Sequence, residues 1–458
     1  MKQNSTFLFL LLVATVVGVP SVQAQLINTF AGNGYGASTG TGGYTGNGGL
    51  ATLAELNSCT GVAFDGAGNI YIADKGNNVV RKVNTYGVIS TFAGNDTAGY
   101  KGDGGQAVSA RLNQPYGVTT DIAGNVYIAD YGNNAVRMVN PSGMISTYVG
   151  GGSAGYLGDG GVARLAHLNG PEGLAVDQSG NLYIADSKNN VVRIVYAIDT
   201  FITTFAGNGS GGYSGDGGQA ISAQLAAPAG IAIDIYGNVY IADYLNNAVR
   251  KVDTAETIST FAGIGYPGYS GDGGAAAGAM LHYPSGVSVY GFGNLYIADQ
   301  GNNVVRSVTP SGVISTFAGT ATNGYKGDGG NANDAQLSSP TGVAADALSR
   351  VFIADYDNNV IRVVYANRPA AVNTIAGTAG ELSVYPNPSN GAFTVTLPAT
   401  SGQAVITVTD VLGRNIETRN IEAASQNTDL YFNALPGSYI VKVTEGNTNY
   451  RAQVVVIK

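Results

Sequence analysis

The chain is poor in the residues on which many catalytic, metal-binding and nucleic-acid-binding sites depend. Its 458 residues include one cysteine, two histidines and no tryptophan, and charged residues make up only 11%. A single cysteine, Cys59, excludes an intramolecular disulfide. The 22 Lys and Arg residues form no cluster and the net charge is −8, which argues against a nucleic-acid surface. So few histidines without clustered ligands also disfavour a zinc or iron site.

Long apolar runs are absent as well, and the longest one lies close to the N-terminus. It covers residues 7–19, follows Lys2, and precedes Val22-Gln23-Ala24. This order is typical of a secretory signal peptide, and 13 apolar residues are few for a membrane span. We therefore predict a signal peptide at 1–24, with a membrane anchor as the alternative, and expect no transmembrane segment elsewhere.

What the chain has in abundance is glycine, 68 residues, and a repeated phrase of the form I-A-D-x-x-N-N-x-V-R. The phrase ends at six arginines: Arg81, Arg137, Arg193, Arg250, Arg306 and Arg362. Successive arginines are separated by 56, 56, 57, 56 and 56 residues. A fixed period of this length indicates stacked units that bury their apolar faces against one another.

One repeat contains four short apolar segments joined by turns. In the second repeat they cover 117–121, 126–130, 135–139 and 144–149. Four antiparallel strands with tight turns make one blade of a β-propeller, and apolar residues on both sides of each strand fit a sheet covered on both faces. Six repeats predict an all-β, six-bladed propeller over 25–379.

A Gly-rich link with an A-x-x-A-x-L phrase, which we expect to form one helical turn, joins successive blades. The fourth-strand phrase occurs seven times, from Thr29 to Thr374, although six blades need six copies. The N-terminal copy can close the ring by joining the last blade, but the sequence leaves open which copy is used.

The phrases P-x-G-V-A-x-D, G-N-x-Y-I-A-D and N-N-x-V-R resemble those of the NHL-repeat β-propellers, over residues 26 to about 379. The resemblance implies the fold. It leaves function open, because the family includes protein-, RNA- and ligand-binding members, and related propellers act as lyases and hydrolases.

A second module follows at 381–458, where the period stops. Short strand-like segments separated by turns predict a small immunoglobulin-like β-sandwich. The phrases Y-P-N-P, N-G-x-F-T-V, D-x-L-G-R and G-x-Y-x-V-K-V resemble the C-terminal sorting domain of the type IX secretion system. The resemblance implies passage through the periplasm, an outer-membrane translocon as partner, and a secreted or surface-displayed product. An ordinary carbohydrate- or protein-binding sandwich is the alternative.

Polar residues that recur in every blade are expected to be structural. The strand-end aspartates, such as Asp186, can accept backbone N–H groups in turns, and the repeated arginines can pair with carboxylates or carbonyls. The aspartates of the G-D-G-G links, such as Asp103, are predicted to serve turns or caps. Calcium binding is the alternative for them, but each link offers a single carboxylate.

Residues that break the repeat are better candidates for a binding site. The turn after the second strand and the link to the next blade emerge on one face, and loops on a rigid scaffold often carry binding residues. The residues of this face that vary between blades and that we assign to ligand binding are Tyr116, Tyr131, Glu172, Tyr244 and Tyr356. An ordinary solvated surface is the alternative interpretation.

We predict a binding or scaffold module with no catalytic residue, no metal ligand and no cofactor. Its ligand would be an extracellular protein, a glycan or a small molecule. The competing hypothesis is an extracellular enzyme, a lyase or a lactonase-like hydrolase, that uses an axial pocket.

Overall fold

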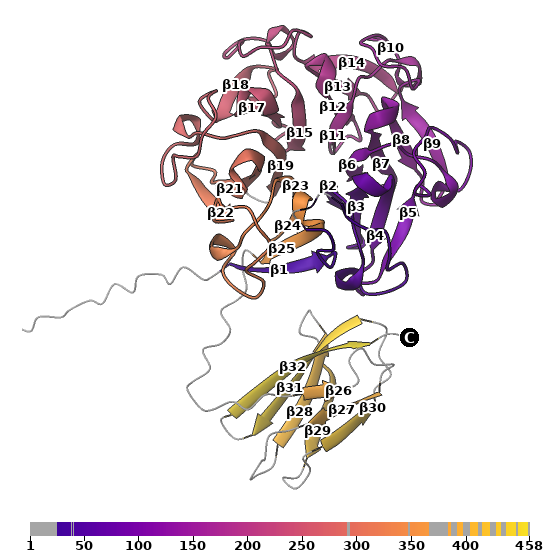
Figure 1. Ribbon diagram of the computed structural model, residues 1–458, viewed down its shortest axis with the longest axis vertical. Helices are drawn as coiled ribbons and strands as arrows, with labels where there is room; N and C mark the ends of the chain where they lie inside the picture. Colours follow the sequence, from indigo (N-terminus) through magenta and orange to yellow (C-terminus); the bar gives the residue numbers. More distant parts are fainter. Residues whose placement is uncertain are drawn as a thin grey trace, which may run out of the picture.

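The computed structural model describes residues 25–37, 39, 41–290, 294–346 and 349–365, together with seven strands between 383 and 456. The predicted signal peptide at 1–24 lies outside the described residues. Residues 25–365 form six antiparallel sheets arranged around an axis (Figure 1). The predicted six-bladed, all-β architecture is confirmed.

Each blade contributes four strands, from the axis outward. The innermost strands are β2 (Cys59–Phe64), β6 (Pro115–Thr120), β11 (Pro171–Val176), β15 (Pro228–Ile233), β19 (Pro284–Tyr290) and β23 (Pro340–Ala345). The second strands are β3 (Ile70–Asp74), β7 (Val126–Asp130), β12 (Leu182–Asp186), β16 (Val239–Asp243), β20 (Asn294–Asp299) and β24 (Arg350–Asp355). The third strands are β4 (Val79–Val83), β8 (Ala135–Val139), β13 (Val191–Val195), β17 (Ala248–Val252), β21 (Val304–Val308) and β25 (Val360–Tyr365). The outermost strands are β5 (Ile89–Ala93), β9 (Ile145–Val149), β14 (Phe201–Ala206), β18 (Ile258–Ala262), β22 (Ile314–Ala318) and β1 (Leu26–Ala31), and a short strand β10 (Gly161–Val162) pairs with β14.

Two sets of 3-10 turns connect the strands. One set follows the second strands: η2 (Lys75–Asn77), η4 (Tyr131–Asn133), η6 (Ser187–Asn189), η8 (Tyr244–Asn246), η10 (Gln300–Asn302) and η12 (Tyr356–Asn358). The other set lies in the links: η1 (Ala51–Leu53), η3 (Ala107–Ser109), η5 (Ala163–Leu165), η7 (Ala220–Ser222), η9 (Ala276–Gly278) and η11 (Ala332–Asp334). The single turn expected from A-x-x-A-x-L is therefore present, with 3-10 geometry.

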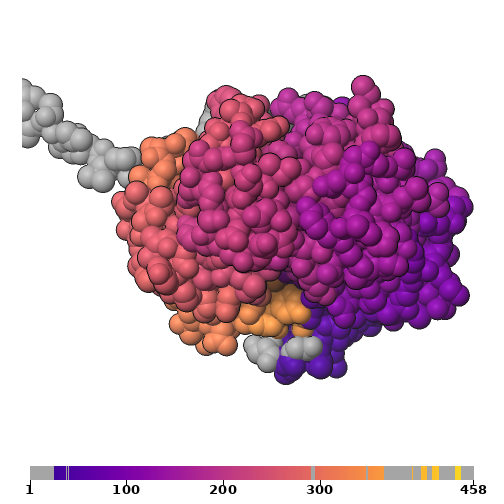
Figure 2. Space-filling model, turned by 90° about the horizontal axis from the view of Figure 1, so that it is seen from above, coloured from indigo at the N-terminus to yellow at the C-terminus, as the bar shows by residue number. Residues whose placement is uncertain are grey.

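The ring is closed by the N-terminal strand. Strand β1 pairs antiparallel with β25, so that Ile27 faces Val364 and Thr29 faces Arg362. Of the two copies that could complete the last blade, the N-terminal one is used, and the copy at Thr374 lies outside the described residues. In the edge-on view of Figure 2, the indigo start of the propeller adjoins the orange last blade.

The core consists of the wedges between neighbouring blades. Between the first and second blades, Val80 and Ala93 of one sheet pack with Val118 and Ile128 of the next, and the link residue Leu112 fills the wedge between them. Leu112 is fully buried, a contribution of about 1.5–3 kcal/mol to the hydrophobic stabilisation. Every blade thus needs both neighbours, as a stacked-repeat fold requires.

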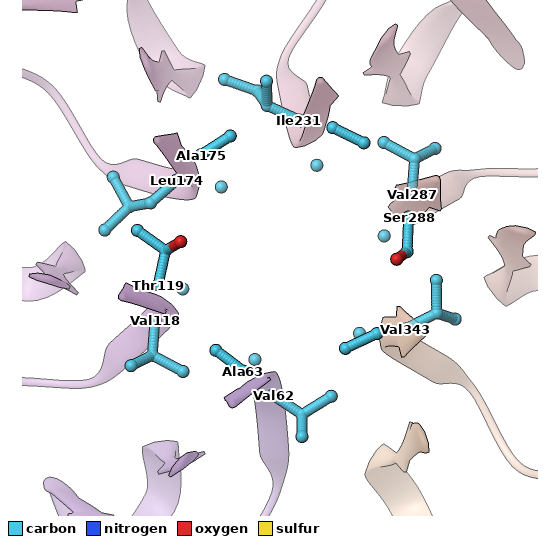
Figure 3. A pocket seen from close by; sticks show the side chains of 18 of the residues that line it. Val62, Ala63, Val118, Thr119, Leu174, Ala175, Ile231, Val287, Ser288 and Val343 are labelled. Carbon is cyan, nitrogen blue, oxygen red and sulfur yellow. The ribbon is translucent and has the colours of Figure 1, made fainter. Parts of the chain in front are cut away.

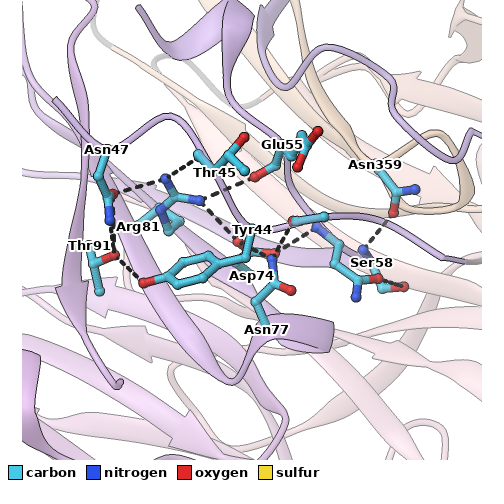
Figure 4. A network of polar contacts seen from close by, with 12 residues as sticks. Tyr44, Thr45, Asn47, Glu55, Ser58, Asp74, Asn77, Arg81, Thr91 and Asn359 are labelled. Atoms are coloured by element: carbon cyan, nitrogen blue, oxygen red, sulfur yellow. Dashed lines mark hydrogen bonds and ion pairs between the residues drawn. The ribbon is translucent and has the colours of Figure 1, made fainter. Parts of the chain in front are cut away.

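A buried polar network repeats in each blade and accounts for the D-x-x-N-N-x-V-R phrase. In the first blade, Asp74 accepts hydrogen bonds from the backbone N–H of Asn57 at 2.8 Å and from Asn77 Nδ2 at 2.9 Å (Figure 4). Arg81 Nη1 lies 3.4 Å from Asp74 Oδ2, and both side chains are fully buried. Burial raises the pKa of Asp74 to about 6, against hydrogen bonds from Asn77 and the charge of Arg81 that lower it. The predicted structural role of these aspartates agrees with this geometry.

The links supply the second partner of each buried arginine. Asp103 pairs with Arg137 Nη2 at 2.5 Å, and the Tyr100 ring lies 5.1 Å from that guanidinium. Asp159, Asp216, Asp272 and Asp328 repeat this pairing with their own arginines. In the first blade Asn47 takes the place of the aspartate and accepts from Arg81 at 3.0 Å. The link carboxylates therefore fix the link to the blade that it enters.

The second asparagine of each phrase joins one blade to the next. Asn78 adopts the left-handed conformation and its Oδ1 accepts from the backbone N–H of Gln114, at 3.0 Å, in the following blade. The same bond joins the last blade to the first, where Ser58 donates to Asn359 Oδ1 at 2.7 Å. Asparagine suits this position because it tolerates a positive φ while its side chain accepts a hydrogen bond.

The C-terminal strands form two antiparallel sheets. One has the order β26 (Ser383–Tyr385), β27 (Ala392–Thr396), β30 (Asn427–Tyr431). The other has the order β29 (Asn415–Ile421), β28 (Ala404–Asp410), β31 (Gly437–Glu445), β32 (Thr448–Val456). Ala404, Ile406 and Val408 are buried and alternate along β28, as in a sheet with one covered face. This arrangement agrees with the predicted β-sandwich.

Candidate functional site

The innermost strands enclose an axial channel with a volume of about 370 Å³. Figure 3 shows its wall, formed by aliphatic side chains from all six blades with the hydroxyl groups of Thr119 and Ser288 among them. The Ser288 hydroxyl is already used, because it accepts from the backbone N–H of Ala345 at 3.1 Å. The side chains that line the channel are therefore mostly aliphatic.

A ring of glycines brings the inner strands into backbone contact. The ring consists of the third residue of each inner strand: Gly61, Gly117, Gly173, Gly230, Gly286 and Gly342. A Cβ atom on Gly173 would lie 2.1 Å from the carbonyl oxygen of Ala229, and one on Gly342 would lie 2.2 Å from that of Thr60. Only glycine permits this approach, so the ring fixes the spacing of the inner strands.

The residues just before the ring lie beside the 3-10 turns, because the first residue of each inner strand pairs with the strand-end aspartate. Pro171, for example, faces Asp186. This geometry places Glu172 next to η6 and Tyr116 next to η4. The five residues assigned from the sequence therefore all lie on this axial face.

Lys75 of the first blade lies near three tyrosines, two from the second blade and one from the sixth. Its Nζ atom is 5.0 Å from the ring centroid of Tyr116, 5.7 Å from that of Tyr131 and 5.8 Å from that of Tyr356. Tyr116 and Tyr131 also contact each other, with ring centroids 6.0 Å apart. We call Lys75, Tyr116, Tyr131, Glu172 and Tyr356 the axial cluster.

The electrostatics of the axial cluster centre on one acid and one base. Burial raises the pKa of Glu172 to about 7, while Lys75, a hydrogen bond from Ser187 and the charge of Lys188 lower it. Burial lowers the pKa of Lys75, opposed by the charge of Glu172. Burial and Glu172 together raise the pKa of Tyr116. The cluster thus places aromatic rings around Lys75, and the charge of Glu172 that acts on this lysine changes near neutral pH.

Tyr244, the remaining residue assigned from the sequence, belongs to a neighbouring aromatic pair. Its ring stacks on Tyr283 with centroids 4.9 Å apart and an interplanar angle of 18°, and His282 lies 4.5 Å from Tyr283. The sequence interpretation did not select Tyr283. The available signal was its position, because the equivalent residues of the other blades are Ser58, Gln114, Gly170, Ala227 and Ser339.

Within the part of the chain that the structure describes, no three His, Cys, Asp or Glu side chains lie close enough to hold a metal ion. Cys59 is buried at the start of β2, and burial raises the pKa of its thiol. The other five inner strands begin with proline at this position, so Cys59 takes the place of a packed proline.

Comparisons with known families match two regions of the chain. Residues 383–458 match the secretion system C-terminal sorting domain, residues 168–194 match the NHL repeat, and residues 18–101, 98–156 and 207–268 match the teneurin NHL domain. The chain therefore combines an NHL-repeat propeller with a sorting domain of the type IX secretion system. This domain implies the secretion translocon as partner and export to the cell surface or the extracellular space. Among the described residues, no helix has the length and apolar character needed to cross a membrane.

Curated relatives match part of this chain. Protein SUPPRESSOR OF QUENCHING 1, chloroplastic, of Arabidopsis thaliana is 29% identical over 58% of this chain and 26% of its own length. Teneurin-4 of Homo sapiens is 32% identical over 45% of this chain and 8% of its own length. The chain thus spans a small part of these relatives.

A solved structure with the same fold is an auxiliary nutrient binding protein from Bacteroides thetaiotaomicron. The match covers 74% of this chain and 76% of the chain of that protein, with a TM-score of 0.55 and 17% sequence identity. At this identity the likeness concerns the fold alone.

Proposed function

We propose that the protein is an extracellular binding module that takes its ligand on the axial cluster. One observation carries the proposal. The polar residues repeated in every blade are used within the framework, whereas several residues that vary between blades lie together around Lys75. A framework residue is needed in all six blades, but a ligand site is needed once.

The chemistry of the axial cluster suits a small molecule or a chain end with both apolar and polar groups. Tyr116, Tyr131 and Tyr356 offer aromatic faces and hydroxyl groups, while Glu172 and Lys75 offer one acceptor and one donor. Pockets that bind small ligands combine such apolar walls with a few polar groups that fix orientation. The auxiliary nutrient binding protein with this fold gives a precedent by name for a binding role.

The proposal is tested by screening the purified protein against oligosaccharides, peptides and small metabolites, followed by calorimetric titration of each hit. The test variants are Glu172→Gln, Tyr131→Ala and Tyr356→Ala. A matched control is Tyr236→Ala, because Tyr236 is 69% exposed and lies in the turn between β15 and β16, away from the 3-10 turns. We expect about tenfold weaker binding in the test variants, equivalent to about 1.4 kcal/mol, and wild-type affinity in the control.

Unfolding curves of the same variants separate binding from folding. Unfolding midpoints no lower than that of wild type, together with weaker binding, support a ligand site. Equal affinity for a hit in all variants would place the site elsewhere. Conversion of a hit into product by the wild-type protein would instead favour the enzyme hypothesis.

A further inference from the structure

Tyr283 has an unusual backbone conformation for a large residue. Its φ angle is 53°, in the left-handed region. The equivalent residues of the other five blades share this conformation, Gly170 with a φ of 61° and Gln114 with a φ of 52° among them, and Tyr283 is the bulkiest of the six. Bulky side chains adopt this conformation at a cost, and such residues are often retained for function. The strained position holds the Tyr283 ring against Tyr244 while leaving it 37% exposed.

A pocket of about 330 Å³ lies beside this aromatic pair. It is lined by the two rings and by polar residues of the fifth and sixth blades: Gln300, Gly301, Asn303, Asn323, Ser338, Ser339 and Asp357. In the described part of the chain, the side-chain amides of Gln300 and Asn323 make no hydrogen bond with protein groups. Asp357 is held in place, since its Oδ2 accepts from the Ser339 hydroxyl at 2.6 Å.

We propose that this pocket is a subsite for a neutral sugar, with the Tyr244–Tyr283 pair as its stacking platform. The inference rests on the proposed binding function and assigns a ligand class to this face. A pyranose ring has an apolar C–H face that can lie on an aromatic ring, and its hydroxyl groups can pair with the amides of Gln300 and Asn323 and with Asp357.

The charges and the ring geometry favour a neutral sugar over other ligands of similar size. Among the residues that the structure describes, Asp357 is the only Asp, Glu, Lys, Arg or His that lines this pocket. Its negative charge disfavours the binding of phosphates and acidic sugars. Quaternary ammonium groups are recognised by cages of several aromatic faces. Tyr244 and Tyr283 cover one face of each other, so only the outer face of a ring is left for a ligand and the pair forms no cage.

The test is calorimetric titration of the purified protein with neutral hexasaccharides of glucose, mannose, xylose and N-acetylglucosamine, and with choline and inorganic phosphate as charged probes. The test variant is Tyr283→Gly, which removes the platform and permits the left-handed conformation. The matched control is Gln114→Gly, the same backbone position in the second blade. We expect at least one hexasaccharide to bind, about tenfold loss of affinity in Tyr283→Gly, and no change in Gln114→Gly.

A further variant, Glu172→Gln, separates this inference from the proposed function. Hexasaccharide binding that is lost in Tyr283→Gly and kept in Glu172→Gln supports the sugar subsite, even if no ligand is found for the axial cluster. Hexasaccharide binding that is lost only in Glu172→Gln supports the axial cluster and overturns the subsite. Failure of every hexasaccharide to bind wild-type protein, with or without choline or phosphate binding, also overturns it.

Discussion

The substitution Gly173→Ala tests whether the inner strands are in backbone contact around the axis. The added Cβ would lie 2.1 Å from the Ala229 carbonyl oxygen and 2.9 Å from the Gly230 Cα, both of the next blade. An ordinary carbon–oxygen contact is about 3.4 Å, so the two strands must separate by roughly 1 Å. Overpacking of this kind costs about 1–3 kcal/mol. We expect the upper part of this range, because the clashing atoms are backbone and cannot rotate away.

The measurement is the free energy of unfolding from urea titration, with Gly66→Ala as the control. A Cβ on Gly66 meets no atom within 4 Å, and its φ is not positive. The free energy of unfolding of Gly66→Ala should therefore equal that of wild type or exceed it by up to about 1 kcal/mol, because alanine restricts the conformations of the unfolded chain. If Gly173→Ala unfolds at the same urea concentration as Gly66→Ala, the glycine ring does not set the spacing of the blades.

Three further outcomes are expected. Burial raises the pKa of Glu172 from 4.5 to about 7, so the folded protein binds the proton of this carboxyl group more tightly than the unfolded chain does. Protonation of Glu172 therefore stabilises the fold. This stabilisation is complete below about pH 4.5 and is lost as the pH rises through 7. Glu172→Gln should remove this loss in urea titrations between pH 4 and 8, and an unchanged pH profile would contradict the burial of Glu172. Asn47→Asp should give Arg81 the link carboxylate that the other blades have, and should raise the free energy of unfolding by at most about 1 kcal/mol. High salt should reduce this increase. An increase that does not depend on salt would argue against the ion pair. Deletion of 381–458 should leave a folded propeller that is not exported, because β1 closes the ring against β25, and an unfolded product would contradict closure within 25–365.

Much of the propeller could be predicted from the sequence because each of the six blades buries the same Asp–Arg turn. A turn that buries Asp74 and Arg81 needs the same donors in every blade, so the phrase recurs at a fixed period and its count gives the blade number. Closure did not follow from the sequence. The phrases at Thr29 and Thr374 have the same strand pattern, and only the pairing of β1 with β25 distinguishes them.

The candidate site was predictable in part for a related reason. Tyr116 and Glu172 differ from their equivalents in every other blade, so comparison of the repeats finds them without coordinates. Tyr244 shares its residue type with Tyr131 and Tyr356, whereas the equivalent position of the remaining three blades carries other residues. The central position of Lys75 depends on how three blades converge, and the raised pKa of Glu172 depends on burial, and neither is visible in a repeat pattern. The functional role of these residues stays a prediction.

Tyr283 shows how the two kinds of information combine. Comparison of the repeats shows that its position accepts small or polar residues in the other blades, but it gives no reason for a tyrosine. The structure shows that the position needs a positive φ, which glycine meets without strain at Gly170. A bulky residue at such a position is unfavourable for the framework, so its presence calls for a compensating contact. The stack on Tyr244 is one such contact, and the sugar bound in the adjoining pocket would be the other.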